Sequence, residues 1–222
     1  MKYKALNCLG LITTALTAPA PASAGEHMYM FHYSNFYSQL KHNTEDGHPD
    51  VRVGLFFIEQ SSKSPCHIAE ARLEYKTHQE QLDIYASGEV TVPIDSNLRK
   101  VNPMLYIKSI SDQPCDISMR VLTKQPLQGE VSFAKLDDIS QQMQTLLTDL
   151  SGSIGKWFTP KVSGVKLDFT EYENGILTTA NGEEIQVNNF QASIDVSQFK
   201  TSDRITLPEA TKHVTPMIVA TK

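Results

Sequence analysis

Short segments rich in β-branched and aromatic residues, separated by polar turns, dominate the first half of the chain. The clearest strand runs from Val51 to Ile58, and others are expected at 69–75, 81–85, 90–92, 104–107 and 117–122. Pro93 ends one of them, because proline has no amide hydrogen to donate within a sheet. Many short strands at regular spacing predict a β-sandwich-like domain over residues 25–127.

Two short helical segments interrupt this β pattern. Within residues 28–41, large side chains recur at helical spacing, with Ser34 as a candidate N-cap. These side chains are Tyr33, Phe36, Tyr37 and Leu40. Such a stripe is typical of a core rather than of a ligand platform. A further helical turn is expected from Asp95 to Lys100, with Asp95 as its N-cap.

The second region, residues 132–159, has the pattern of a long amphipathic linker helix. Its apolar positions are Leu136, Ile139, Met143, Leu146, Leu147 and Leu150, continued by Ile154, Trp157 and Phe158. Acidic and amide side chains occupy the opposite face, and Pro160 ends the pattern.

This apolar stripe is too continuous to face water, since each large side chain gains roughly 1.5–3 kcal/mol on burial. We expect it to pack against the protein's own β regions. The alternative is a partner or dimer interface in its C-terminal half, with candidate residues Met143, Leu146, Leu150 and Trp157. 

Residues 160–222 return to a β pattern and predict a smaller antiparallel module. Alternation over 165–169 predicts a strand, and the Asn-Gly pairs at 174–175 and 181–182 predict the turns of a three-stranded meander. Alternation over 190–196 predicts a fourth strand. The whole chain is therefore predicted to be mainly β with one long helix, an α+β protein.

A weak internal repeat links the two β regions. Val90–Leu105 and Ile205–Ile218 share the same order of strand, proline and second strand. Two related modules joined by the helix would produce this similarity. Chance would produce it equally well, because short self-matches are common in β proteins.

Residues 1–24 have the order of a secretory signal peptide. Lys2 and Lys4 precede a mostly apolar stretch, which ends in the small-residue motif Ala22-Ser23-Ala24. The stretch is too short to cross about 30 Å of hydrocarbon, which disfavours a membrane anchor. We expect cleavage before Gly25 and a soluble periplasmic protein with no membrane span.

Signal cleavage removes Cys8 and leaves Cys66 and Cys115. An even pair in an oxidising compartment predicts a disulfide bond. The alternative is a reactive thiol beside His67.

Composition limits the classes of partner that are expected. The formal net charge of −5, with no basic cluster, disfavours a nucleic-acid partner. Four histidines lie close in sequence, but no two have the spacing that places zinc ligands on one helix face, so no metal or cofactor is predicted. They are His27, His32, His42 and His48.

Ser-x-x-Lys matches at 132–135, 153–156 and 197–200 lack the companion motifs of penicillin-recognising enzymes, so no catalytic residue is assigned.

Several short segments resemble those of one protein family. They are Tyr33–Leu40, Val92–Asp95 with Asn102-Pro103, Cys115–Met119, and Trp157–Pro160 with Gly164-Val165. On these residues the chain is similar to an uncharacterised family of secreted proteins from Gram-negative bacteria, a domain of unknown function. The resemblance implies export and assigns no catalytic residue.

The combined pattern predicts an envelope protein that binds a protein partner, or a second copy of itself, or assists assembly without catalysis. Isolated β modules offer edges and faces for such contacts. Two alternatives remain. One is a hydrolase acting on an envelope polymer, and the other is a protein that binds a small ligand or metal at its histidine-rich start.

Overall fold

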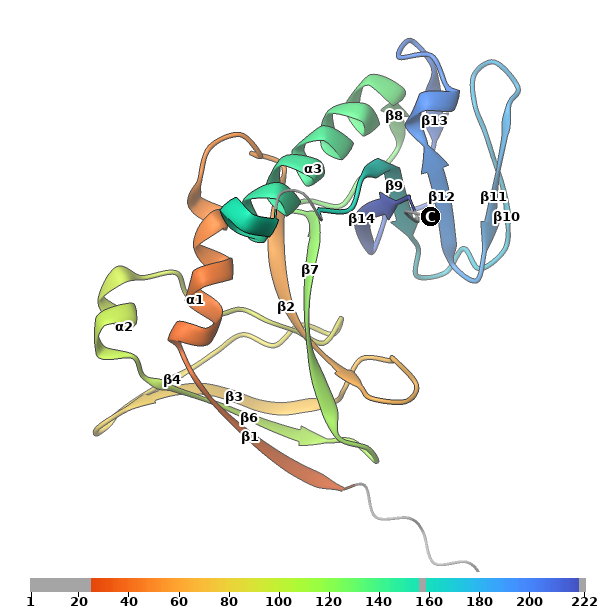
Figure 1. The fold of residues 1–222 in the computed structure, drawn as a ribbon. Coiled ribbons are helices and arrows are strands. Elements are labelled where there is room, and N and C mark those ends of the chain that lie inside the picture. Colours follow the sequence, from red (N-terminus) through yellow and green to blue (C-terminus); the bar gives the residue numbers. More distant parts are fainter. Residues whose placement is uncertain (1–24, 156–158, 220–222) are drawn as a thin grey trace, which may run out of the picture.

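The computed structural model describes residues 25–155 and 159–219 (Figure 1). The strands are β1 (Glu26–His32), β2 (Val51–Glu59), β3 (Ile68–Tyr75), β4 (His78–Gln81), β5 (Glu89–Val90), β6 (Met104–Ile110), β7 (Cys115–Thr123), β8 (Glu130–Ser132), β9 (Val162–Asp168), β10 (Gly175–Thr178), β11 (Glu184–Asn188), β12 (Gln191–Asp195), β13 (Arg204–Thr206) and β14 (His213–Ile218). The helices are α1 (Ser34–Leu40), α2 (Ser96–Val101) and α3 (Phe133–Gly155), with 3-10 turns η1 (Lys41–Thr44) and η3 (Val196–Gln198). The predicted α+β class, mainly β with one long helix, is confirmed.

Two antiparallel sheets form the N-terminal half. One has the strand order β1-β6-β3-β4 and the other β5-β2-β7, and their strands run in crossing directions in Figure 1. Their inner faces meet through aromatic rings, because Tyr29 and Phe31 lie 6.5 and 6.3 Å from the ring of Phe57. Such large rings supply much of the apolar area that a core buries.

Three elements of this half differ from the sequence prediction. Residues 26–32 form strand β1, for which no element was predicted, because they pair with β6 along their whole length. α1 follows with Tyr33 as its N-cap and without the Ser34 cap that we expected. The β3–β4 turn lies at Lys76, whose φ is +54°, so the next strand is His78–Gln81 instead of 81–85.

The C-terminal sheet has the order β10-β11-β12-β9-β14. The Asn-Gly pair at 181–182 joins β10 to β11 as predicted. The pair at 174–175 does not make the expected hairpin, because β9 pairs with β12 and β14 instead of β10. Phe190 lies in the β11–β12 turn with a φ of +63°, so the fourth strand begins one residue later than expected.

Helix α3 bridges the two halves, as Figure 1 shows. It contacts β2 and β7 on one side and β9 on the other. Gly152 leaves helical geometry near its end, with a φ of +64° and a ψ of −175°. Buried residues of both halves form a single hydrophobic cluster, so the division at 127 and 160 stays a prediction. No helix in the described ranges is long and apolar enough to cross a membrane.

Asp50 ties α3 to the loop before β2. Its Oδ2 accepts hydrogen bonds from Lys135 Nζ at 2.7 Å and from Gln142 Nε2 at 2.9 Å. Its amide donates to Gln142 Oε1 at 2.8 Å. The hydrogen bond from Lys135, followed by that from Gln142, holds the pKa of Asp50 below its ordinary value of 3.8.

We expect Asp50→Asn to weaken the acid dependence of stability. A carboxylate whose pKa folding lowers stabilises the native state above its unfolded pKa, and this contribution is lost as the pH falls through the folded pKa. Between about pH 5 and pH 3 the native protein should therefore lose more stability than the variant. The side chain is 41% exposed, so the difference should stay below about 1 kcal/mol. Urea unfolding at each pH measures the difference, with Asp149→Asn in α3 as a control that removes a carboxylate outside the Asp50 contacts. Equal curves for Asp50→Asn and native protein would contradict the prediction.

Candidate functional site

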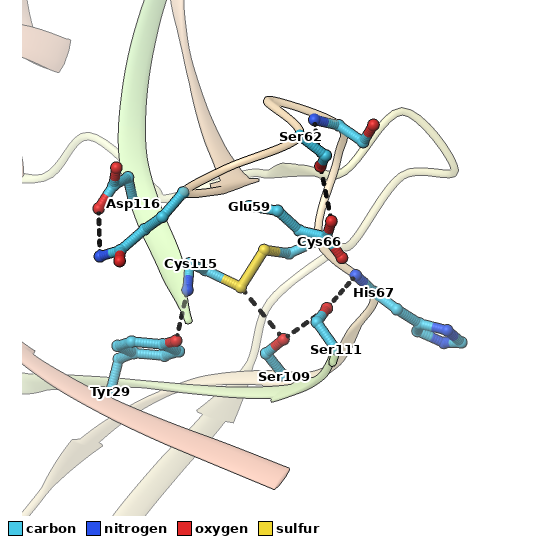
Figure 2. The surroundings of a disulfide bond; sticks show 11 residues. Tyr29, Glu59, Ser62, Cys66, His67, Ser109, Ser111, Cys115 and Asp116 are labelled. Carbon is cyan, nitrogen blue, oxygen red and sulfur yellow. Dashed lines mark hydrogen bonds between the residues drawn. A yellow bond between two sulfur atoms is a disulfide. The ribbon is translucent and has the colours of Figure 1, made fainter. Parts of the chain in front are cut away.

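Cys66 and Cys115 form the predicted disulfide where the two N-terminal sheets meet (Figure 2). Cys66 precedes β3 of one sheet, and Cys115 begins β7 of the other. Both residues are buried, with exposed fractions of 3% and 7%. Figure 2 shows the His67 ring directed away from the sulfurs, so the reactive-thiol alternative is not realised.

Hydrogen bonds surround this disulfide and connect it to β1 and β6. The Tyr29 hydroxyl of β1 accepts from the amide of Cys115 at 2.6 Å. Ser109 Oγ of β6 lies 3.2 Å from Cys115 Sγ and 3.0 Å from Ser111 Oγ, which accepts from the amide of His67. This arrangement holds the corner of the two sheets and gives the disulfide a structural role.

Three of the segments that resemble the family meet at Tyr33. Its hydroxyl donates to the carbonyl of Pro93 at 2.8 Å and accepts from the amide of Asp95 at 3.0 Å, and its own amide donates to Pro103. Burial is the main cause that raises the pKa of Tyr33. Asp95 caps α2 as predicted, by accepting from the amide of Asn97 at 2.6 Å. These segments therefore position α1 and α2 rather than supply reactive groups.

Two of the four histidines of the N-terminal region, His42 and His48, have clearly different environments. His42 Nδ1 lies 2.6 Å from Glu45 Oε2. His48 is fully buried, and neither ring nitrogen has a hydrogen-bond partner in the structure. Across residues 25–155 and 159–219, no three His, Cys, Asp or Glu side chains are grouped as metal ligands would be.

The Ser-x-x-Lys matches have local structural roles where they are described. Ser132 Oγ accepts from the amide of Lys135 at 3.2 Å at the start of α3, while the lysine Nζ binds Asp50. Ser197 Oγ donates to Asp195 Oδ1 at 2.6 Å. In neither pair does the lysine Nζ form a hydrogen bond with the serine hydroxyl, as an activating base would.

The candidate interface residues of α3 divide into two groups. Met143 and Leu146 are fully buried inside the chain. Leu150 is partly buried and, with Leu147, lines a small hollow of about 300 Å³ beside β7. Trp157 lies outside the described residues. An interface at this end of the helix stays a prediction.

A groove of about 950 Å³ runs beside β5, between the N-terminal sheets and β14. Its ionisable lining residues are Arg52, Glu89, Lys124, Lys212 and His213, and its apolar ones include Val53, Val92, Ile94, Leu122 and Pro126. Arg52 and Glu89 form an ion pair, in which Nη2 donates to Oε2 at 2.9 Å. A Cβ on Gly54 would lie 2.8 Å from Glu89 Oε1, so glycine leaves room for this buried carboxylate.

His213 forms one wall of the groove. Its ring meets Phe56 edge to face, with centroids 5.7 Å apart. Burial, followed by the nearby charge of Lys212, lowers the pKa of His213. Sequence analysis missed the groove because its residues come from distant segments and share no local motif.

The outer side of β1 and β6 is a second surface feature. Met28, Met30 and Ile110 are 48%, 59% and 38% exposed. Met28 pairs with Lys108 and Met30 with Tyr106, so Ile110 and Tyr106 lie diagonally beside Met28. We call the outward-facing side chains Met28, Met30, Tyr106 and Ile110 the β1–β6 face. Lys108 and its ion-pair partner Glu26 lie among them on the same side. β1 pairs with β6 alone among the described strands, which leaves its other edge open.

Comparison with models of protein families identifies the family of this chain. The model of a family described as "Protein of unknown function (DUF2987)" matches residues 26–169, more than half of the chain. The chain belongs to this family. The match covers the Tyr33 contacts, the disulfide, α3 and β9, while Lys212 and His213 of the groove lie beyond it. DUF2987 assigns no activity, and the expectation of an uncharacterised family is confirmed. No curated protein and no solved structure is significantly similar to the chain.

Proposed function

We propose that this DUF2987 protein is a non-enzymatic accessory of the bacterial envelope, exported to the periplasm, that binds a protein partner through the β1–β6 face. The order of charged, apolar and small residues over 1–24 supports export. The disulfide supports an oxidising compartment, because disulfides are rare in the cytosol.

The observation that carries partner binding is the exposure of Met28 and Met30 on an edge strand. Neighbouring exposed apolar side chains are typical of interaction sites, whereas single exposed apolar residues are common everywhere. Methionine side chains adapt to different partner shapes. The open edge of β1 adds backbone groups to which a partner strand can pair.

Site-specific photocrosslinking in a Gram-negative host tests this proposal. A benzophenone amino acid at Met30 is expected to crosslink the exported protein to one partner of defined mass. Ile176 is the matched control, since it is 45% exposed and lies on β10, an edge strand of the C-terminal sheet. Mass measurement of the same preparation is expected to place Gly25 first.

Three outcomes would contradict the proposal. Crosslinks of equal yield from Met30 and Ile176 would show that the β1–β6 face is not selective. Absence of crosslinks from Met30 would show that no partner binds at the β1–β6 face. Recovery of a folded chain that retains Met1 would show that the chain is not exported and cleaved as proposed. A crosslinked product of twice the chain mass would instead identify the partner as a second copy.

A further inference from the structure

We propose that the groove beside β5 binds an amphiphilic anion, a carboxylate with an apolar chain. The groove uses different residues from the β1–β6 face, so the two proposals stand or fall separately. Its volume of about 950 Å³ lies within the range of pockets that bind small ligands.

The charges of the groove favour an anion. Arg52 and Glu89 neutralise each other in their ion pair. Lys124 and Lys212 remain, and neither forms an ion pair with any described residue. In a chain of net charge −5, the groove is thus a local site of positive charge. Positive charges focused in a cleft attract anionic ligands.

The walls of the groove favour an apolar chain behind the anionic group. Leu122, Val92 and Ile94 line it, together with the backbone around Thr91. Tyr85 stands at its rim with 54% of its surface exposed, which leaves the ring available to cover a bound chain. Apolar walls with a few polar groups that fix orientation are typical of small-molecule sites.

Strand edges in the groove are already occupied, which disfavours an extended peptide. The Asn43 side chain bonds both the amide and the carbonyl of Val53, at 2.6 and 2.9 Å. On the other side of β5, Tyr85 and Thr91 make backbone hydrogen bonds with Glu89 and Asp83. Since a peptide that adds as a strand needs unpaired backbone groups, a ligand held by its head group and apolar chain fits better.

Calorimetric titration of the full mature chain with decanoate tests the proposal. Decanoate is expected to bind in a 1:1 complex, while decanol, which lacks the charge, and acetate, which lacks the chain, bind at least about tenfold more weakly. The double variant Lys124→Gln/Lys212→Gln is expected to weaken decanoate binding about tenfold, since two partly solvated charge contacts are lost. Its affinity for decanol should not change.

A matched double variant keeps the overall charge comparable. Lys76→Gln/Lys200→Gln removes two exposed lysines outside the groove and is expected to bind decanoate as the native chain does. Equal loss of binding in both double variants would mean non-specific charge attraction and would overturn the site. No saturable decanoate binding, or tight binding of a leucine-ended hexapeptide instead, would overturn the ligand class.

Discussion

Cys66→Ser is expected to lower the free energy of unfolding by about 4 kcal/mol, by the loop-entropy relation for this chain separation. The bond closes a loop between cysteines 49 positions apart, so its loss releases considerable chain entropy in the unfolded state. Cys115→Ser opens the same loop and should have the same effect. Urea unfolding of the oxidised native chain and of each variant measures the difference.

The double variant Cys66→Ser/Cys115→Ser is the control for this prediction. Because a disulfide is one interaction with two ends, the double variant should be about as stable as either single variant. Reducing agent should destabilise the native chain and leave the variants unchanged. Rapid alkylation of both cysteines in unreduced native protein would contradict the bond.

Leu146→Asp is expected to destabilise the chain strongly. Leu146 is fully buried at the centre of the helix that joins the two halves. Truncation of such a leucine alone costs about 2–5 kcal/mol, and a buried unpaired carboxylate adds to that cost. Thermal unfolding of dilute protein should therefore show a large loss of stability or an unfolded chain.

Thr145→Asp is the matched control, since it places the same charge one position away on an exposed side of the helix. It should change stability by less than about 0.5 kcal/mol. Unchanged stability of Leu146→Asp together with loss of self-association would contradict internal packing. Leu150→Asp tests the remaining interface prediction separately, through loss of association with little loss of stability.

The candidate sites could be predicted from the sequence to very different degrees. The disulfide followed from counting cysteines after the predicted signal cleavage, because an even pair in the predicted oxidising compartment has one pairing. The groove gave no signal, since Arg52, Lys124 and Lys212 are ordinary surface residues until the fold brings them together. The β1–β6 face was not predicted either, because no strand was expected at Met28 and Met30 and their pairing with β6 joins distant parts of the chain.

Local patterns in the sequence determined the elements whose causes are themselves local. These are the α3 stripe, the Asp95 cap and the Asn-Gly turn at 181–182, each set by side chains a few positions apart. Only the tertiary structure decided that 26–32 is a strand and that β9 lies between β12 and β14. The reason is that strand pairing joins distant residues, and its stability depends on the burial and neighbours that the whole fold supplies.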